Sequence, residues 1–222
     1  MKISIVIPTK NEGRSIKEII EQCHPYCDEI LVVDGHSGDL TRDIAQEAGA
    51  KVILDNQRGK GDGLRTGLKE AKGDIVVFID ADGSHDANDI PKIIQPIIEG
   101  KADLVVGSRM RGGSDELHGD IGKFIRIIGS DIITLTINYR FGVRLTDSQN
   151  GFRAIRKDVG LKIGLKEDIF TIEQEMIMKS LKHGYKIMEI PAHEYSRKYG
   201  DSNIVVWKVA HRYVWCLIKN LF

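Results

Sequence analysis

Short apolar runs alternate with helix-like segments through the first half of the chain, and this alternation is the strongest constraint on its fold. The clearest run, residues 75–79, is continuous and rich in β-branched residues, as is typical of a strand buried on both faces. A strand–helix–strand order predicts an α/β fold, a mostly parallel sheet with helices on both faces. The predicted strands are 3–7, 29–33, 51–54, 74–79 and 103–106; the predicted helices are 14–22, 40–48, 63–71 and 89–99.

The second half of the chain has a less regular pattern. A long helix is predicted over residues 121–139 and a second over 170–183, with strands at 150–155 and 187–190. We find no internal repeat and no low-complexity linker. The two halves are therefore expected to form one continuous body.

Composition excludes several classes of protein. The 222 residues are enough for one α/β domain, and 32 Lys and Arg balance 32 Asp and Glu, so the charge gives no indication of nucleic-acid binding. Three cysteines without a CxxC pair predict neither a disulfide framework nor a zinc site, which suits a reducing compartment. No uncharged apolar run reaches the roughly 18 residues that a membrane-spanning helix needs.

Polar segments follow three of the predicted strands directly. They are residues 8–12, 34–37 and 80–82. In open α/β sheets, ligands bind outside the carboxyl ends of the strands. Three polar strand ends at one edge therefore predict a ligand site there.

Asp80 and Asp82 stand one residue apart at the end of the most apolar strand. Two adjacent carboxylates repel each other unless a cation lies between them, and Mg²⁺ is often held by one or two carboxylates together with substrate phosphates. The sequence thus predicts a divalent metal at this strand end. A solvated turn or helix cap is the alternative.

A glycine-rich segment around Lys60, residues 59–63, precedes a predicted helix. It has neither the GxxxxGK[ST] nor the GxGxxG spacing. Glycines still let the backbone approach a ligand, and a helix N-terminus beside a lysine suits anionic groups. A flexible turn is the alternative.

The long helix of the second half carries Lys123, Arg126 and Ser130 at i, i+3 and i+7, so all three lie on one stripe. With Arg109 they would form a cluster of donors for a phosphate. The alternative is an ordinary solvated helix face, since exposed Lys and Arg are common.

The order and spacing of these motifs resemble family 2 inverting glycosyltransferases with the GT-A fold. The motifs are residues 8–12 (PTKNE), 33–39 (VDGHSGD), 59–61 (GKG) and 79–85 (IDADGSH). Within this family, the chain is similar to dolichyl-phosphate mannose synthase and related polyprenyl-phosphate hexose synthases. That narrower likeness lies in residues 107–109 (GSR), 147–153 (DSQNGFR) and 197–202 (RKYGDS).

The resemblance extends to about Ser202 and implies a Rossmann-like GT-A fold with a nucleotide-sugar-binding half (1–110) and an acceptor-side half (111–203). An amphipathic C-terminal helix (204–222) is expected to follow. The resemblance also implies roles for individual residues. The nucleotide sugar would be bound by Pro8, Thr9, Glu12, Asp34, Lys60, Asp80, Ala81, Asp82, Arg197 and Lys198. Mg²⁺ or Mn²⁺ would be held by Asp80, Asp82 and Ser84, the acceptor phosphate by Arg109, Arg126 and Ser130, and the catalytic groups would be Asp82, Arg109 and Arg197.

Some positions depart from the family pattern or carry less weight. Ser84 stands where close relatives often have Gln, and Asn203 where they often have Lys. Glu173 and Glu175 point to nearly opposite sides of a helix, and the resemblance favours Glu175 as the one that faces the site. His85 is expected to lie behind the metal or at the surface, and His193, Asp147 and Arg153 to shape the acceptor side.

The segment 204–222 contains both tryptophans, three cations and no acidic residue. On a helix the three cations would lie within roughly 40° of one another. Such a helix suits a membrane interface, or alternatively it packs on the core.

The expected activity is metal-dependent transfer of a hexose to a polyprenyl phosphate, for glycan or glycolipid assembly, by an enzyme peripheral on the cytoplasmic face of a membrane. GDP-mannose is the first-choice donor, followed by UDP-glucose and UDP-N-acetylglucosamine. The alternatives are a soluble transferase with a small phosphorylated acceptor and a non-catalytic nucleotide-sugar-binding module.

Overall fold

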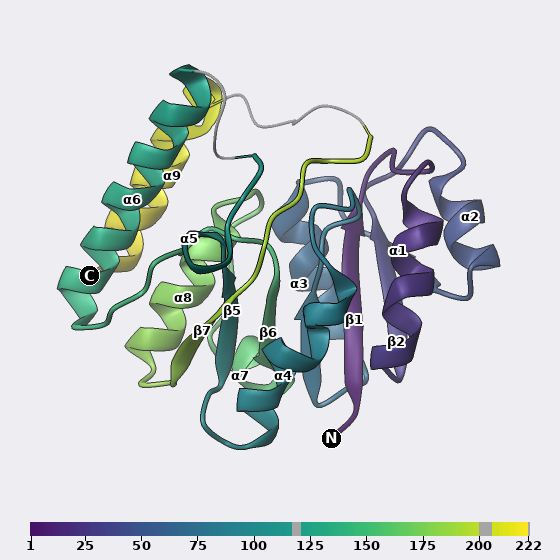
Figure 1. Cartoon of the computed structure of the whole chain (residues 1–222), viewed down its shortest axis with the longest axis horizontal. Helices are drawn as coiled ribbons and strands as arrows, with labels where there is room; N and C mark the ends of the chain where they lie inside the picture. Colours follow the sequence, from purple (N-terminus) through teal and green to yellow (C-terminus); the bar gives the residue numbers. More distant parts are fainter. Residues whose placement is uncertain (117–120, 200–205, 222) are drawn as a thin grey trace.

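One seven-stranded sheet runs through the protein, seen in a computed structural model that describes residues 1–116, 121–199 and 206–221 (Figure 1). The strand order is β3-β2-β1-β4-β6-β5-β7. The strands are β1 (Ile3–Thr9), β2 (Glu29–Asp34), β3 (Lys51–Leu54), β4 (Ile75–Phe78), β5 (Leu104–Ser108), β6 (Arg153–Arg156) and β7 (Ile187–Pro191). The predicted α/β class and mostly parallel sheet are confirmed.

Strand β6 departs from the parallel pattern. It lies between β4 and β5 and runs antiparallel to both, with Phe78 opposite Arg153 and Ile75 opposite Arg156. The start of β6 therefore meets the end of β4. As a result, the segment that precedes β6 reaches the same sheet edge as the segments that follow the parallel strands.

Helices cover both faces because successive strand side chains point to opposite faces. On one face, Ile75 and Val77 pack with α1 (Ile16–Cys23), α2 (Thr41–Glu47) and α4 (Ile90–Ile98). On the other, Val76 and Phe78 pack with α3 (Lys60–Glu70), α7 (Lys157–Lys162) and α8 (Ile172–Lys182). Three short helices, η1 (His24–Tyr26), η2 (Ala87–Asp89) and α5 (Arg109–Gly112), complete this part of the fold.

Two long helices, α6 (Ile121–Phe141) and α9 (Val206–Leu221), lie side by side beyond α8 (Figure 1). Cys216 and Leu217 of α9 are buried in the same core cluster as Met176 of α8. The predicted C-terminal helix thus packs on the core, although Trp215 is 64% exposed. Residues 204 and 205, at its predicted start, lie outside the described residues.

Both helices also carry apolar side chains that face solvent. On α6 these residues recur at helical spacing along one stripe: Phe124, Ile128, Ile132, Leu135 and Tyr139. On α9 they are Val214, Trp215 and Ile218. Among the described residues, no helix is both long and apolar enough to cross a bilayer.

Candidate functional site

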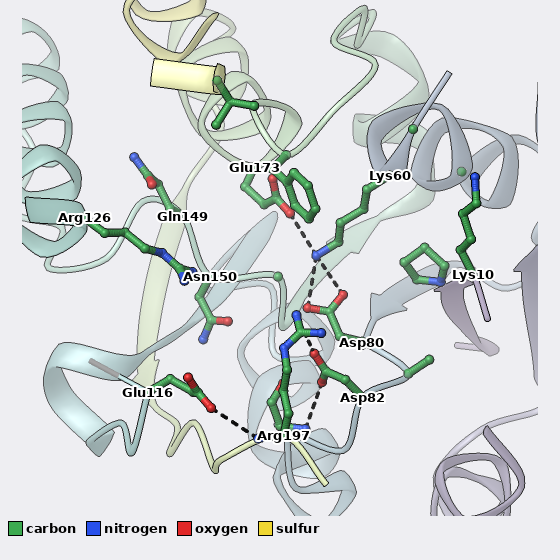
Figure 2. Close-up of a pocket in the computed structure, with 18 of the residues that line it drawn as sticks. Lys10, Lys60, Asp80, Asp82, Glu116, Arg126, Gln149, Asn150, Glu173 and Arg197 are labelled. Carbon is green, nitrogen blue, oxygen red and sulfur yellow. Dashed lines mark hydrogen bonds and ion pairs between the residues drawn. The ribbon is translucent and has the colours of Figure 1, made fainter. Parts of the chain in front are cut away.

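A cavity of about 1260 Å³ lies at the carboxyl ends of β1, β2 and β4 and extends between α6 and α9. It brings together residues from both halves of the chain, as Figure 2 shows for its charged centre. Most residues predicted for the site line it: Pro8, Thr9, Glu12, Lys60, Asp80, Ala81, Asp82, Ser84, Arg109, Arg126, Ser130 and Arg197.

Lys60 sits between two carboxylates at the centre of the cavity (Figure 2). Its Nζ lies 2.7 and 3.0 Å from the two oxygens of Asp80 and 3.1 Å from Oε1 of Glu173. Burial alone would raise the pKa of Asp80, but the Lys60 ammonium holds it well below the usual range. Burial would lower the pKa of Lys60, yet Asp80 and Glu173 raise it. Both groups are therefore charged at neutral pH.

The close approach of the chain to this ion pair depends on a glycine. A Cβ on Gly151 would lie 2.6 Å from Oδ2 of Asp80 and 2.8 Å from Nζ of Lys60, closer than van der Waals contact allows. Gly151 belongs to the segment that precedes β6. The antiparallel strand and this glycine together bring the second half of the chain against the Asp80 carboxylate.

Asp82 pairs with Arg197, whose Nη2 lies 3.0 Å from Asp82 Oδ2. The other carboxylate oxygen of Asp82 accepts a hydrogen bond from the backbone N–H of Ser84 at 3.0 Å. Glu12 lines the same part of the cavity, and its pKa is raised, first by burial and then by repulsion from Asp82. Several carboxylates thus converge here and require cations.

The donor atoms at this end of the cavity fit a hard divalent ion. Asp80 and Asp82 offer carboxylate oxygens and Ser84 a hydroxyl, which are the ligand types that Mg²⁺ and Mn²⁺ prefer. Among the described residues, no group of three or more His, Cys, Asp or Glu side chains is arranged to hold a metal. A metal here would therefore need further oxygens from a bound ligand, such as phosphates.

Arg109 is buried and held by two carboxylates. Its Nε and Nη2 donate to Asp147 at 2.6 and 3.1 Å, and its Nη1 donates to Glu194 at 3.3 Å. Burial would raise the pKa of Asp147, but Arg109 keeps it below the usual range. Although Arg109 lines the cavity, most of its donors are already used, so its predicted contact with a phosphate stays a prediction.

Arg126 and Ser130 lie on α6 and line the cavity together, as their spacing predicts. Lys123, from the same predicted stripe, instead forms an ion pair with Glu116 at 3.2 Å. The stripe therefore offers one arginine and one hydroxyl to the cavity, next to apolar neighbours such as Ile133.

Two residues predicted to bind the nucleotide are directed elsewhere. Asp34 is fully buried, and its carboxylate accepts from the N–H of Ser37 at 2.9 Å and from the Ser37 hydroxyl at 2.5 Å. The ammonium of Lys198 pairs with Glu18 on α1. Neither side chain lines the cavity. Both are satisfied within the protein, which sequence spacing alone does not show.

Asp55 was not predicted, although it directly follows β3 and lines the cavity near Gly35. Lys10 lies on the same side; it belongs to the predicted polar segment 8–12 but had no predicted role of its own. The strand-end rule that singled out Asp80 would also have found Asp55. Gln149 and Asn150 line the opposite side. They belong to the family-like stretch 147–153 but had no predicted role, and the strand-end rule does not apply to them because they precede an antiparallel strand.

The expectation for the two glutamates of α8 was wrong. Glu173 lines the cavity, whereas Glu175 is buried away from it and accepts hydrogen bonds from the backbone N–H groups of Lys166 and Glu167. Other expectations concern neighbouring residues. His85 is buried and stacked on Phe152, with Nε2 3.8 Å from Asp80.

Arg153 is a buried structural group, since it donates to the backbone carbonyls of Asn150 and Glu173. His193 does not line the cavity, and its Nε2 is 3.0 Å from Asp115. Asn203, where relatives often carry lysine, is outside the described part of the chain.

A cavity at the strand ends of a mixed α/β sheet, with a paired-carboxylate centre, is typical of a nucleotide-binding transferase. The model of glycosyl transferase family 2 matches residues 4–163. The chain belongs to glycosyltransferase family 2, and its fold is GT-A.

The curated relatives narrow the comparison. The chain is 33% identical over 208 residues to glycosyltransferase AglJ of Haloferax volcanii, spanning 91% of this chain and 66% of that protein. It is 33% identical over 241 residues to a UDP-N-acetylglucosamine–dolichyl-phosphate N-acetylglucosaminyltransferase of Methanococcus voltae, spanning 95% and 94%. To a dolichol-phosphate mannosyltransferase of Pyrococcus furiosus it is 32% identical, spanning 92% of this chain but only 59% of the relative.

Among solved structures, glucosyl-3-phosphoglycerate synthase from Mycobacterium tuberculosis, in complex with Mg²⁺ and UDP, superposes with a TM-score of 0.78. The match covers 99% of this chain and 79% of that one at 21% identity. The same enzyme has also been solved with Mn²⁺, UDP and its product. This likeness shows a shared fold.

Proposed function

We propose that the protein transfers a hexose from a nucleotide diphosphate sugar to a polyprenyl phosphate, with inversion at the sugar carbon. The observation that carries this proposal is the shape of the cavity. One end has the carboxylates and cations around Asp80, and the other runs between apolar side chains of α6 and α9, including Ile132 and Leu217. A charged donor would bind at the end around Asp80, and a lipid acceptor would bind at the apolar end between α6 and α9.

At the charged end, Asp80, Asp82 and Ser84 would hold Mg²⁺ or Mn²⁺ against the donor diphosphate. When bound, the ion would offset the negative charge that develops on the leaving phosphate. Arg197 would release Asp82 and turn its guanidinium to the same phosphate oxygens, which stabilises the transition state electrostatically. Lys60 would keep Asp80 ionised and oriented.

At the apolar end, the acceptor phosphate would lie near Arg126 and Ser130 on α6. A phosphate is already anionic at neutral pH, so the reaction needs no general base. The protein's task is to position the attacking oxygen in line with the bond that breaks. Arg109 would fix the local geometry through Asp147 and add one donor to the phosphate.

The acceptor end also suits a membrane surface. Exposed apolar residues on α6 and α9 lie near exposed cations such as Arg212, a combination typical of helices that rest in the headgroup region. The names of two relatives include dolichyl or dolichol phosphate. These observations support a peripheral position, which we place on the cytoplasmic face.

The decisive experiment is a radiolabelled transfer assay with GDP-mannose, UDP-glucose and UDP-N-acetylglucosamine. Each donor is offered with dolichyl phosphate, undecaprenyl phosphate or 3-phosphoglycerate, with and without Mg²⁺ or Mn²⁺. We expect metal-dependent transfer to a lipid phosphate from at least one donor. Transfer to 3-phosphoglycerate alone would replace the lipid acceptor by a small one, and no turnover with any pair would contradict an enzymatic function for these substrates.

A further inference from the structure

Three residues that line the cavity each carry a buried polar side-chain atom with no hydrogen-bond partner among the described residues. Thr9, at the end of β1, has its Oγ1 unpaired; Glu173, whose side chain is 3% exposed, has Oε2 unpaired, and Gln149 has Nε2 unpaired. Of the last two, Oε2 is an acceptor and Nε2 a donor. Buried polar groups are almost always paired in native proteins, so a pair of unpaired groups in a cavity indicates a ligand that pairs them.

The position of these atoms indicates which part of a donor would reach them. In Figure 2, Lys10 lies on one side of Asp80, and Gln149 lies on the other, with Glu173 next to Lys60. Asp55, at the end of β3, belongs to the Lys10 side. A nucleoside bound at the β1–β3 ends, with its diphosphate at Asp80 and Asp82, would extend its sugar toward Glu173.

The chemistry of Glu173 narrows the choice further. Its Oε1 is held by Lys60 at 3.1 Å, and its backbone carbonyl accepts a hydrogen bond from Arg153 at 2.7 Å. Burial raises the pKa of Glu173, and Lys60 only partly opposes this. In either protonation state the carboxyl group can accept a hydrogen bond from a neutral group, and the ionised form repels phosphate. A neutral hydroxyl is a suitable partner, because it donates to Glu173 and can accept from the amide of Gln149.

We propose that Glu173 is a specificity-determining residue that accepts a hydrogen bond from one hydroxyl of the transferred hexose, with Gln149 as a second contact. This inference rests on the proposed function, since it needs a sugar nucleotide in the cavity. A site built to pair a hydroxyl rejects analogues that lack it, because the buried carboxylate oxygen is then left unpaired. Glu173 would thus select donors by the presence of one hydroxyl.

The test compares full donors with deoxy donors. The preferred substrate among GDP-mannose, UDP-glucose and UDP-N-acetylglucosamine is assayed beside its 3-, 4- and 6-deoxy analogues, together with the 2-deoxy analogue where the sugar has a 2-hydroxyl. For the wild type we expect one analogue to lose about 10- to 100-fold in kcat/KM. In Glu173→Ala, kcat/KM for the full donor should fall to about the value that the wild type has with that deoxy analogue. The ratio of kcat/KM for the full donor to kcat/KM for the same deoxy analogue should then approach one.

Glu175→Gln is the matched control, because Glu175 is a buried carboxylate on the same helix that does not line the cavity. It should keep the wild-type ratio even if stability falls. A second measurement is calorimetric binding of the nucleoside diphosphate alone, which Glu173→Ala should leave within about threefold.

The outcomes separate the two proposals. If the wild type transfers sugar but every deoxy ratio is unchanged in Glu173→Ala, Glu173 does not read a hydroxyl, and the proposed function stands. If the wild type transfers no sugar from any of the donors, the proposed function fails and the inference fails with it.

Discussion

The two ends of the cavity are built on different principles. At the charged end, strand termini meet the start of α3, and the two carboxylates after β4 each have a cationic partner: Asp80 has Lys60, and Asp82 has Arg197. The acceptor end consists of helices α6 and α9, which contribute apolar walls and expose further apolar residues to solvent. The first end is matched to a compact, multiply charged group, and the second to a long apolar one.

This difference indicates that the two ends would select their substrates by different physical properties. Ion pairs at the charged end must be exchanged for bonds to ligand and metal, so binding there depends on charge and geometry. Apolar walls discriminate mainly by area and shape. Changes at one end should therefore alter donor chemistry, and changes at the other should alter lipid and membrane binding.

The largest effect is expected for Asp82→Ala. Loss of this carboxylate removes a predicted metal ligand and leaves Arg197 unpaired, so sugar transfer should fall by at least about 100-fold. The measurement is the metal-dependent transfer assay. Asp158→Ala, at an exposed ion pair with Arg156, is the control and should keep full activity. Undiminished transfer by Asp82→Ala would rule out its metal role.

Arg109→Ala tests whether the buried ion pairs of Arg109 with Asp147 and Glu194 stabilise the fold. Removing this buried cation leaves Asp147 and Glu194 uncompensated, and we expect the free energy of unfolding to fall by about 3–5 kcal/mol, measured in urea. The exposed pair of Lys17 and Glu21 on α1 is the control, since Lys17→Ala should cost less than about 1 kcal/mol.

The pH dependence gives a second readout of the same pair. Because the folded-state pKa of Asp147 is lowered, its contribution is fully present above the unfolded value, near pH 4, and is lost as pH falls through the folded value. The loss of stability in acid should therefore be smaller in Arg109→Ala. The prediction would be contradicted if the free energy of unfolding of Arg109→Ala fell in acid as much as that of the wild type, or if it were unchanged at neutral pH.

At the acceptor end, the double variant Leu135→Glu and Trp215→Glu should weaken membrane binding. Both side chains are more than 60% exposed, so folding should be little affected. Burial of such side chains in lipid is worth about 1.5–3 kcal/mol each, so binding to vesicles of equal phosphatidylglycerol and phosphatidylcholine should fall more than tenfold. Ile98→Glu, on α4, is the control. Binding is measured by sedimentation of the protein with the vesicles. If the double variant and the wild type sediment with the vesicles equally, the membrane contact lies elsewhere.

The smallest effect is expected for His193, which pairs with Asp115. Its ring nitrogens lie 3.1 Å from the carbonyl of Gly112 and 3.0 Å from Asp115, and these hydrogen bonds raise its pKa. A raised pKa stabilises the fold below the unfolded value, near pH 6.5, and the gain is lost as pH rises through the folded value.

Relative to the wild type, His193→Gln should therefore have a lower free energy of unfolding at pH 6, and this difference should be smaller at pH 8. The loss should stay below about 1 kcal/mol, because the pair is partly exposed. Unfolding curves at the two pH values measure the difference. A variant that is equally affected at both would show that the protonated ring adds nothing.

Local patterns in the sequence predicted the strands and the position of Asp80 and Asp82, because burial of a parallel strand and the polar turn after it leave a clear signal. They did not predict that β6 runs between β4 and β5, since strand order in a sheet is decided by pairing between distant segments. Without that order, Gln149 could not be placed in the cavity.

The two glutamates of α8 show a second limit. Helix α8 is buried almost all round, with Glu173, Glu175 and Met176 all inaccessible, so it has no polar stripe to indicate which side faces a ligand. Asp34 shows a third, because a strand-end carboxylate can equally bind its own loop. For the two glutamates the deciding contacts lie in other segments, whereas the partner of Asp34 is Ser37 in its own loop, and spacing alone does not separate a loop contact from a ligand contact.

The reversed direction of β6 has a consequence for how such a protein can change. Because β6 meets β4 head to tail, the loop before it, residues 142–152, reaches the active edge without belonging to any parallel strand–helix unit. Its side chains can vary without changing the register of β1–β4, except where the loop is tied to the cavity, as at Gly151 against Asp80 and at Asp147 against Arg109. The fold thereby fixes the carboxylate pair and leaves the other positions of this loop free to diversify.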